Sequence, residues 1–157
     1  MAEVVRMEEV SRRDFAGMVT GLLALASAGA QTAEAQGKGK ALPELTSGVF
    51  KPKPGKGMVG GHESHQFLAG MLAGGTIRLE MHESAQQPGA PHEAMGTHKH
   101  SEIWLVKRGT ATLYLNGVEH TMEAGDVGLC CAGDEHWIAN KGQTELSYFV
   151  VTVGPPE

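Results

Sequence analysis

Apolar and polar side chains alternate along the second half of the chain, which is the pattern of half-buried β-strands. Between Thr76 and His82 apolar residues take every second position, and polar residues lie between them. Asn116 and Gly117 separate two further strand-like runs and tolerate the positive φ angles of a tight hairpin turn. The expected strands are 76–82, 102–107, 110–115, 118–123, 127–131 and 146–153.

These strands recur about every 8 to 12 residues with glycine-rich turns between them, which is the spacing of sandwiches and barrels. The sequence suggests no convincing helix after residue 35. The chain has 157 residues and 41% apolar positions, so it has room for one ordinary domain. We therefore predict an all-β fold with a single antiparallel sandwich or barrel.

Residues 1–35 contain the three parts of an export signal in the correct order. Arg12 and Arg13 form an arginine pair, an apolar run extends from Ala16 to Ala28, and small residues of a cleavage site follow. This segment resembles a twin-arginine (Tat) signal, which implies a bacterial protein exported to the periplasm. The apolar run is too short and too rich in glycine for a stable membrane anchor. The alternative is an amphipathic helix with a fortuitous arginine pair.

Residues 36–61 are rich in glycine, lysine and proline, so we expect an exposed arm or linker there and the β-domain at 62–157. The net charge of −5 at pH 7 argues against a nucleic-acid partner. The two cysteines of the chain, Cys130 and Cys131, are neighbours, which excludes a scaffold of several disulfides and a zinc module of several cysteines.

His98 and His100 are two residues apart, so on a strand their side chains point to the same face, and Glu102 continues that face. Imidazole and carboxylate groups together bind first-row divalent metals such as iron, manganese, nickel, copper and zinc. The pattern indicates a site for one such ion. The alternative is an exposed polar strand face without a metal.

The spacing of the following residues is similar to the two motifs of the cupin superfamily. Glu102 is followed after six residues by Gly109, as in the first motif. The fixed positions of the second motif match at Gly125, Gly133, His136 and Asn140, with Cys131 where proline is usual. The resemblance extends from about Gly75 to Val153 and implies a small jelly-roll β-barrel, commonly dimeric, with one metal ion in its mouth.

The first motif departs from the family pattern. The family glutamate lies four residues after the second histidine, so Glu102 makes His98 the second histidine and leaves Gly96 at the position of the first. The resemblance implies that His98, Glu102 and His136 bind the metal, with Glu102 also a candidate general base. His100, or in reserve His92, would take the vacant position. A local deletion that makes His98 and His100 the histidine pair is the other explanation.

Cupins include both enzymes and binding proteins, so the fold alone does not define the activity. We expect an exported metal-binding protein, and specifically a dioxygenase-like oxidoreductase that acts on a small oxygenated substrate. The alternatives are a non-catalytic module that binds a sugar or a phenolic compound, and a metal-dependent isomerase or lyase. A homodimer is expected in each case.

Replacing both Arg12 and Arg13 by lysine is expected to block export, because twin-arginine signals require the arginine pair and not only its positive charge. Cell fractionation followed by immunodetection would measure the periplasmic share. Delivery of the double variant at the wild-type level would contradict the twin-arginine assignment.

Overall fold

The computed structural model describes residues 41–156, which contain nine strands and no helix. The strands are β1 (Glu44–Leu45), β2 (His62–Leu72), β3 (Arg78–Gln86), β4 (Ser101–Arg108), β5 (Thr110–Leu115), β6 (Val118–Glu123), β7 (Val127–Cys130), β8 (His136–Ala139) and β9 (Leu146–Gly154). The predicted signal and the first part of the predicted arm, residues 1–40, lie outside this range. Within it, no helix is long and apolar enough to cross a bilayer.

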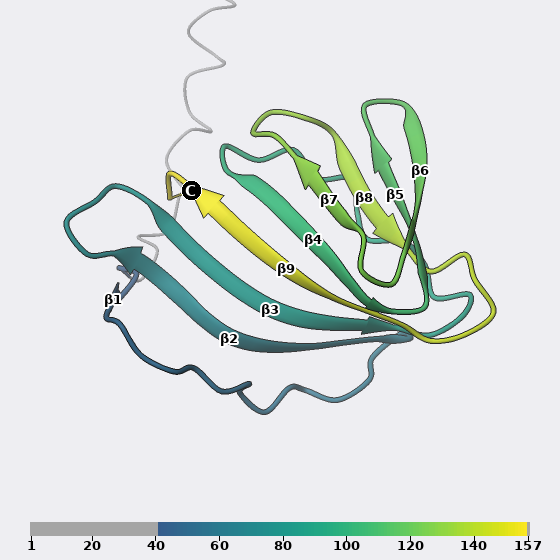
Figure 1. Cartoon of the computed structure of the whole chain (residues 1–157), viewed down its shortest axis with the longest axis horizontal. Helices are drawn as coiled ribbons and strands as arrows, with labels where there is room; N and C mark the ends of the chain where they lie inside the picture. Colours follow the sequence, from purple (N-terminus) through teal and green to yellow (C-terminus); the bar gives the residue numbers. More distant parts are fainter. Residues whose placement is uncertain (1–40, 157) are drawn as a thin grey trace, which may run out of the picture. The chain divides into compact units, whose positions relative to one another are not determined.

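The strands form two sheets, as Figure 1 shows. The larger sheet has the order β1-β2-β3-β9-β4-β7, and the smaller sheet has the order β6-β5-β8. The two-residue pairing of β1 with β2 is parallel, and the other pairings between these strands are antiparallel. The predicted all-β antiparallel fold is therefore confirmed.

The apolar core lies between the two sheets, where β7 of the larger sheet faces β5 and β6. A Cβ on Gly128 would lie 2.5 Å from Leu113 Cδ2 and 3.0 Å from Met122 Sδ, so glycine allows this close approach of the sheets. The buried cluster contains Trp104, Val106, Ala111, Leu113, Met122, Cys130, Ile138, Leu146, Tyr148 and Val150.

Strand β3 turns its polar side toward the interior. His82 lies opposite Val150 and Glu80 opposite Thr152 on β9. Directly opposed residues of an antiparallel pair share a face, and both β9 residues are buried. Glu80 and His82 therefore lie on the inner face, whereas Leu79 and Met81, which alternate with them, face outward. The alternation expected at 76–82 is present in a strand that begins two residues later and extends to Gln86.

Strand β2 is absent from the strands that the sequence predicts. It pairs with β3 over almost its full length, and its register shifts between Gln66 and Leu68. Such a bulge places an extra residue in the strand and interrupts the alternation of its faces. The period of two is consequently interrupted in this strand.

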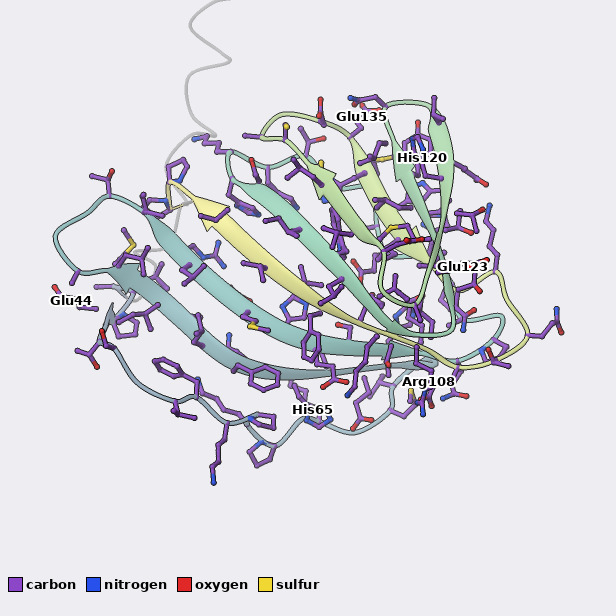
Figure 2. The ribbon with its side chains drawn as sticks, viewed as in Figure 1. Glu44, His65, Arg108, His120, Glu123 and Glu135 are labelled. Atoms are coloured by element: carbon purple, nitrogen blue, oxygen red, sulfur yellow. The ribbon has the colours of Figure 1, made fainter. Side chains whose placement is uncertain are left out.

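The segment before β2 runs along the outer edge of that strand (Figure 1). Glu44 pairs with Met71, and Lys53 N donates to the Gln66 carbonyl oxygen at 2.8 Å. His65, labelled in Figure 2, has Nδ1 3.2 Å from the Lys53 carbonyl oxygen. The segment is largely exposed, and it covers part of an otherwise open sheet edge.

Candidate metal centre

Three side chains from separate segments converge at one end of the space between the sheets. His98 lies in the loop before β4, Glu102 is the second residue of β4, and His136 is the first residue of β8. One ligand atom from each lies within 4.8 Å of the other two. Glu102 Oε2 is 3.4 Å from His136 Nε2. We call these residues the His98/Glu102/His136 triad.

Backbone pairing holds the segments of the triad together. Gly96 N donates to the His136 carbonyl oxygen at 2.8 Å, and His136 N donates to the Gly96 carbonyl oxygen at 3.0 Å. Gly133 N donates to the His98 carbonyl oxygen at 2.8 Å. The loop that carries His98 is thus joined to the turn before β8. Glu102 joins them from β4, where it lies opposite Cys130 of β7.

The surroundings of His136 favour one tautomer. Its Nδ1 lies 3.2 Å from the Asp134 carbonyl oxygen and 3.2 Å from Cys130 Sγ. A carbonyl oxygen only accepts hydrogen bonds, so it favours the proton on Nδ1 and leaves the Nε2 lone pair directed at the triad. The Trp104 ring, with its centroid 5.4 Å from that of the imidazole, packs against the same side chain. His136 is therefore prepared to bind a metal through Nε2.

Cys130 is a buried thiol next to His136, and its neighbour Cys131 is exposed. Both cysteines are free. Burial, together with the charges of Asp134 and Glu102, raises the pKa of Cys130 to about 11. The group therefore remains a neutral thiol at physiological pH, and it adds no negative charge beside the triad.

His100 lies beside the triad and not within the group of converging ligand atoms. It is buried, its ring stacks on that of His98 with centroids 4.6 Å apart, and its Nε2 is 3.3 Å from Glu102 Oε1. These contacts orient both neighbours. Glu102 consequently has one oxygen directed at His136 and the other at His100.

His92 is placed elsewhere. Its ring stacks on Trp137 with centroids 4.8 Å apart. Trp137 follows His136 on β8, so it points to the opposite face of that strand. The structure therefore does not bring the reserve ligand to the triad.

The triad fits a divalent metal ion. Two imidazole nitrogens and one carboxylate oxygen match the donors that first-row metals such as iron and manganese prefer. Two atoms that each bind one ion at about 2.1 Å can lie at most about 4.2 Å apart. Because the triad atoms already lie within 4.8 Å of one another, binding requires only small side-chain movements.

A cavity of about 570 Å³ lies between the inner faces of β2 and β3 and the segment before β2. Its lining includes Lys53, Lys56, Glu80 and His82. Glu80 lies opposite Thr152, which in turn lies opposite Glu102, so the cavity and Glu102 share the inner face of the larger sheet. From the sequence alone, Lys53 and Lys56 belong to an exposed arm, because a local pattern does not show which part of a sheet a segment packs against.

Glu93 connects the cavity to the apolar core. It lines the cavity and accepts a hydrogen bond from the Tyr148 hydroxyl at 3.2 Å. Gln86 Nε2 donates to the same hydroxyl at 2.8 Å. Burial and the nearby Glu93 charge raise the pKa of Tyr148 well above its usual value, so this hydroxyl remains a donor. The contact helps to hold the loop that leads to His98.

Comparison with known proteins places the chain in a family. Residues 70–152 match the cupin domain family. A curated protein from Thermotoga maritima named "Oxalate-binding protein" is 33% identical over 66 residues, which are 40% of this chain and 54% of that protein. The chain thus spans about half the length of the curated relative that it matches.

Solved structures show the same fold at low sequence identity. An RmlC-like cupin from Shewanella frigidimarina has a TM-score of 0.53 and 18% identity, over 69% of this chain and 86% of that chain. KdgF from Halomonas sp. has a TM-score of 0.56 and 15% identity, over 71% of this chain and 96% of that chain. These similarities support the fold that the sequence motifs imply.

Iodoacetamide at pH 8 is expected to modify Cys131 but not Cys130 in the folded protein, because burial blocks access to Cys130 and raises its thiol pKa to about 11. Intact-mass spectrometry would count the adducts. Folded Cys131→Ser should remain unmodified and should become modified in urea. Rapid modification of folded Cys131→Ser would show that Cys130 is not buried beside His136.

Proposed function

The chain belongs to the cupin family, and we propose that it binds one divalent metal ion through His98, Glu102 and His136 and uses that ion on a small oxygenated ligand. The convergence of three metal-binding side chains from three segments carries this proposal. Candidate ions are iron, manganese, nickel, copper and zinc, since all accept imidazole together with carboxylate ligands.

The proposed reaction is a dioxygenase-like oxidation. A divalent ion in this site would polarise a chelating oxygen atom and provide coordination positions for O₂. The chain's own residues would bind the ion and accept or donate protons. Glu102 Oε1 lies 3.3 Å from His100 Nε2. This oxygen can accept a proton from a bound ligand, and the His100 contact holds it in place.

A non-catalytic binding site is the second candidate function. The Thermotoga maritima relative is named for oxalate binding, and this supports a small dicarboxylate as the ligand class here. A metal-dependent isomerase or lyase would use the same three side chains without a requirement for O₂. The three candidates differ in turnover and in oxygen consumption, not in the metal site.

Metal binding is expected to be stoichiometric and to depend on the triad. Co²⁺ titration of the metal-free protein, without a histidine tag, should give one site per chain. His98→Ala and His136→Ala should each lower the affinity at least about tenfold, because each removes a metal ligand, and even changes at residues that only hydrogen-bond to a ligand typically cost about 10- to 100-fold. His120→Ala is the matched control, since this exposed histidine lies on β6 (Figure 2). His92→Ala should also bind normally.

The metal content of protein purified from its export compartment tests the same proposal with the native ion. Iron, manganese, nickel or copper that is lost in the His98→Ala, His136→Ala double variant supports the oxidoreductase, and oxygen consumption with phenolic or carboxylate substrates completes the test. Zinc favours the isomerase or lyase. Full metal occupancy in His136→Ala, or no metal binding by the folded wild type, would overturn the assignment.

We also propose export and dimerisation. The signal-like residues 1–35 support export, and the arginine variants described above test it. The outer face of the larger sheet supports a homodimer, because it exposes Leu105, Val127 and Leu129 on adjacent strands. Exposed apolar patches of this kind commonly mark protein interfaces.

Leu129→Glu is expected to convert a dimer into a monomer, because it would bury a carboxylate within the interface without a partner. Light scattering during size-exclusion chromatography measures the mass. Val118→Glu is the control, because Val118 is as exposed as Leu129 but lies on β6 of the smaller sheet. A wild-type monomer, or an intact Leu129→Glu dimer, would contradict this interface.

A further inference from the structure

We propose that the cavity between β2, β3 and the segment before β2 is a second binding site, which takes a small organic anion that also carries hydroxyl groups. The ammonium groups of Lys53 and Lys56 bind the anionic group, and the inner face of β2 and β3 binds the hydroxyl groups. This site is separate from the His98/Glu102/His136 triad and goes beyond the proposed function.

The cavity has the size and the walls of a small-molecule site. Its volume of about 570 Å³ lies within the range of about 300 to 1,000 Å³ that is usual for such sites. The inner face of β2 and β3 forms one wall, and residues 53–57 form the other. No member of the triad is among the lining residues, so a ligand here does not need the metal ion.

Backbone hydrogen bonds fix the second wall to β2 on both sides of Lys56. Before it, Lys53 N donates to the Gln66 carbonyl oxygen at 2.8 Å. After it, Val59 and His62 exchange two hydrogen bonds, at 2.8 Å and 2.9 Å. The two lysines are therefore held at the cavity although their segment is exposed.

These lysines bring positive charge to the cavity that no described carboxylate neutralises. Lys53 Nζ donates to the neutral Gln66 Oε1 at 3.1 Å. Within residues 41–156, neither Lys53 nor Lys56 forms an ion pair. Each ammonium carries three N–H donors, so both groups can still donate to a ligand.

The carboxylates of the lining, in contrast, already have partners. Glu63 Oε1 lies 3.2 Å from His65 Nε2, Glu80 pairs with Arg78, and Glu93 Oε1 accepts from the Tyr148 hydroxyl at 3.2 Å. The charges that are still available to a ligand are consequently those of the lysines. An anionic group gains most from them, and its hydrogen bonds are strengthened by the charge on both partners.

Uncharged polar groups line the wall that β2 and β3 form. Gln66 lies opposite His82, and Ser64 lies opposite Ser84. All four side chains belong to the lining. Amide, imidazole and hydroxyl groups can both donate and accept hydrogen bonds, as the hydroxyl groups of a ligand do. The cavity therefore favours a ligand that has hydroxyl groups as well as an anionic group.

The cationic wall lies outside the part of the chain that matches the family. Lys53, Lys56 and Gln66 all precede residues 70–152, which match the cupin domain. The family match consequently does not account for this wall, and the proposed site is a feature of this chain.

Calorimetric titration with gluconate tests the proposal, because gluconate combines a carboxylate with a chain of hydroxyl groups. Saturable binding is expected in the protein as purified. Glucitol, which has no charge, and acetate, which has no hydroxyl group, should each bind at least about tenfold more weakly. Removal of metal with EDTA should leave the gluconate affinity unchanged, because the triad does not line the cavity.

The Lys53→Gln, Lys56→Gln double variant should lower the gluconate affinity at least about tenfold with its melting temperature retained, since both side chains are exposed. The Lys53→Arg, Lys56→Arg variant should retain binding. The Lys51→Gln, Lys107→Gln variant is the matched control, because it changes the net charge equally and neither residue lines the cavity.

Three results would overturn the inference: no saturable gluconate binding, equally tight binding of glucitol, or wild-type affinity in the Lys53→Gln, Lys56→Gln protein. Gluconate binding that disappears with EDTA would place the anion at the metal and would also overturn it, while the proposed function stands. Gluconate binding by a protein that binds no metal would support the inference and remove the proposed function.

Discussion

The double hydrogen bond between the backbones of Gly96 and His136 is the constraint on which the candidate centre depends. It joins the loop that precedes β4 of the larger sheet to the first residue of β8 in the smaller sheet. His98 and His136 can approach Glu102 because this pairing fixes the distance between their segments. The same pairing holds the Gly96 backbone close enough to the imidazoles that only hydrogen fits on its Cα.

The interior between the sheets has two chemically different parts. Beneath the smaller sheet it is an apolar core built on the close contact of Gly128 with Leu113. Toward β2 and β3 it is a polar cavity, because β3 presents Glu80 and His82 inward. Glu102 lies on the same inner face as buried Trp104 of the apolar core and Glu80 of the cavity.

Strand prediction from the sequence succeeded where local alternation and turn residues agree, as at the hairpin of Asn116 and Gly117. It failed for β2, whose bulge interrupts the alternation. Local alternation also could not predict that the apolar side of β3 faces outward. Alternation defines two faces of a strand, but only the packing of the second sheet decides which face is inside.

The sequence by itself determined the fold class and indicated candidate metal ligands, because turn glycines and the intervals around Glu102 and His136 are local properties of the chain. It left His100, with His92 in reserve, as the candidates for the position that Gly96 leaves without a histidine. Only the tertiary structure separated them, since one stacks on His98 and the other on Trp137, on the far face of β8. Contacts between segments distant in sequence decide which ligand atoms converge, and spacing along the chain does not encode those contacts.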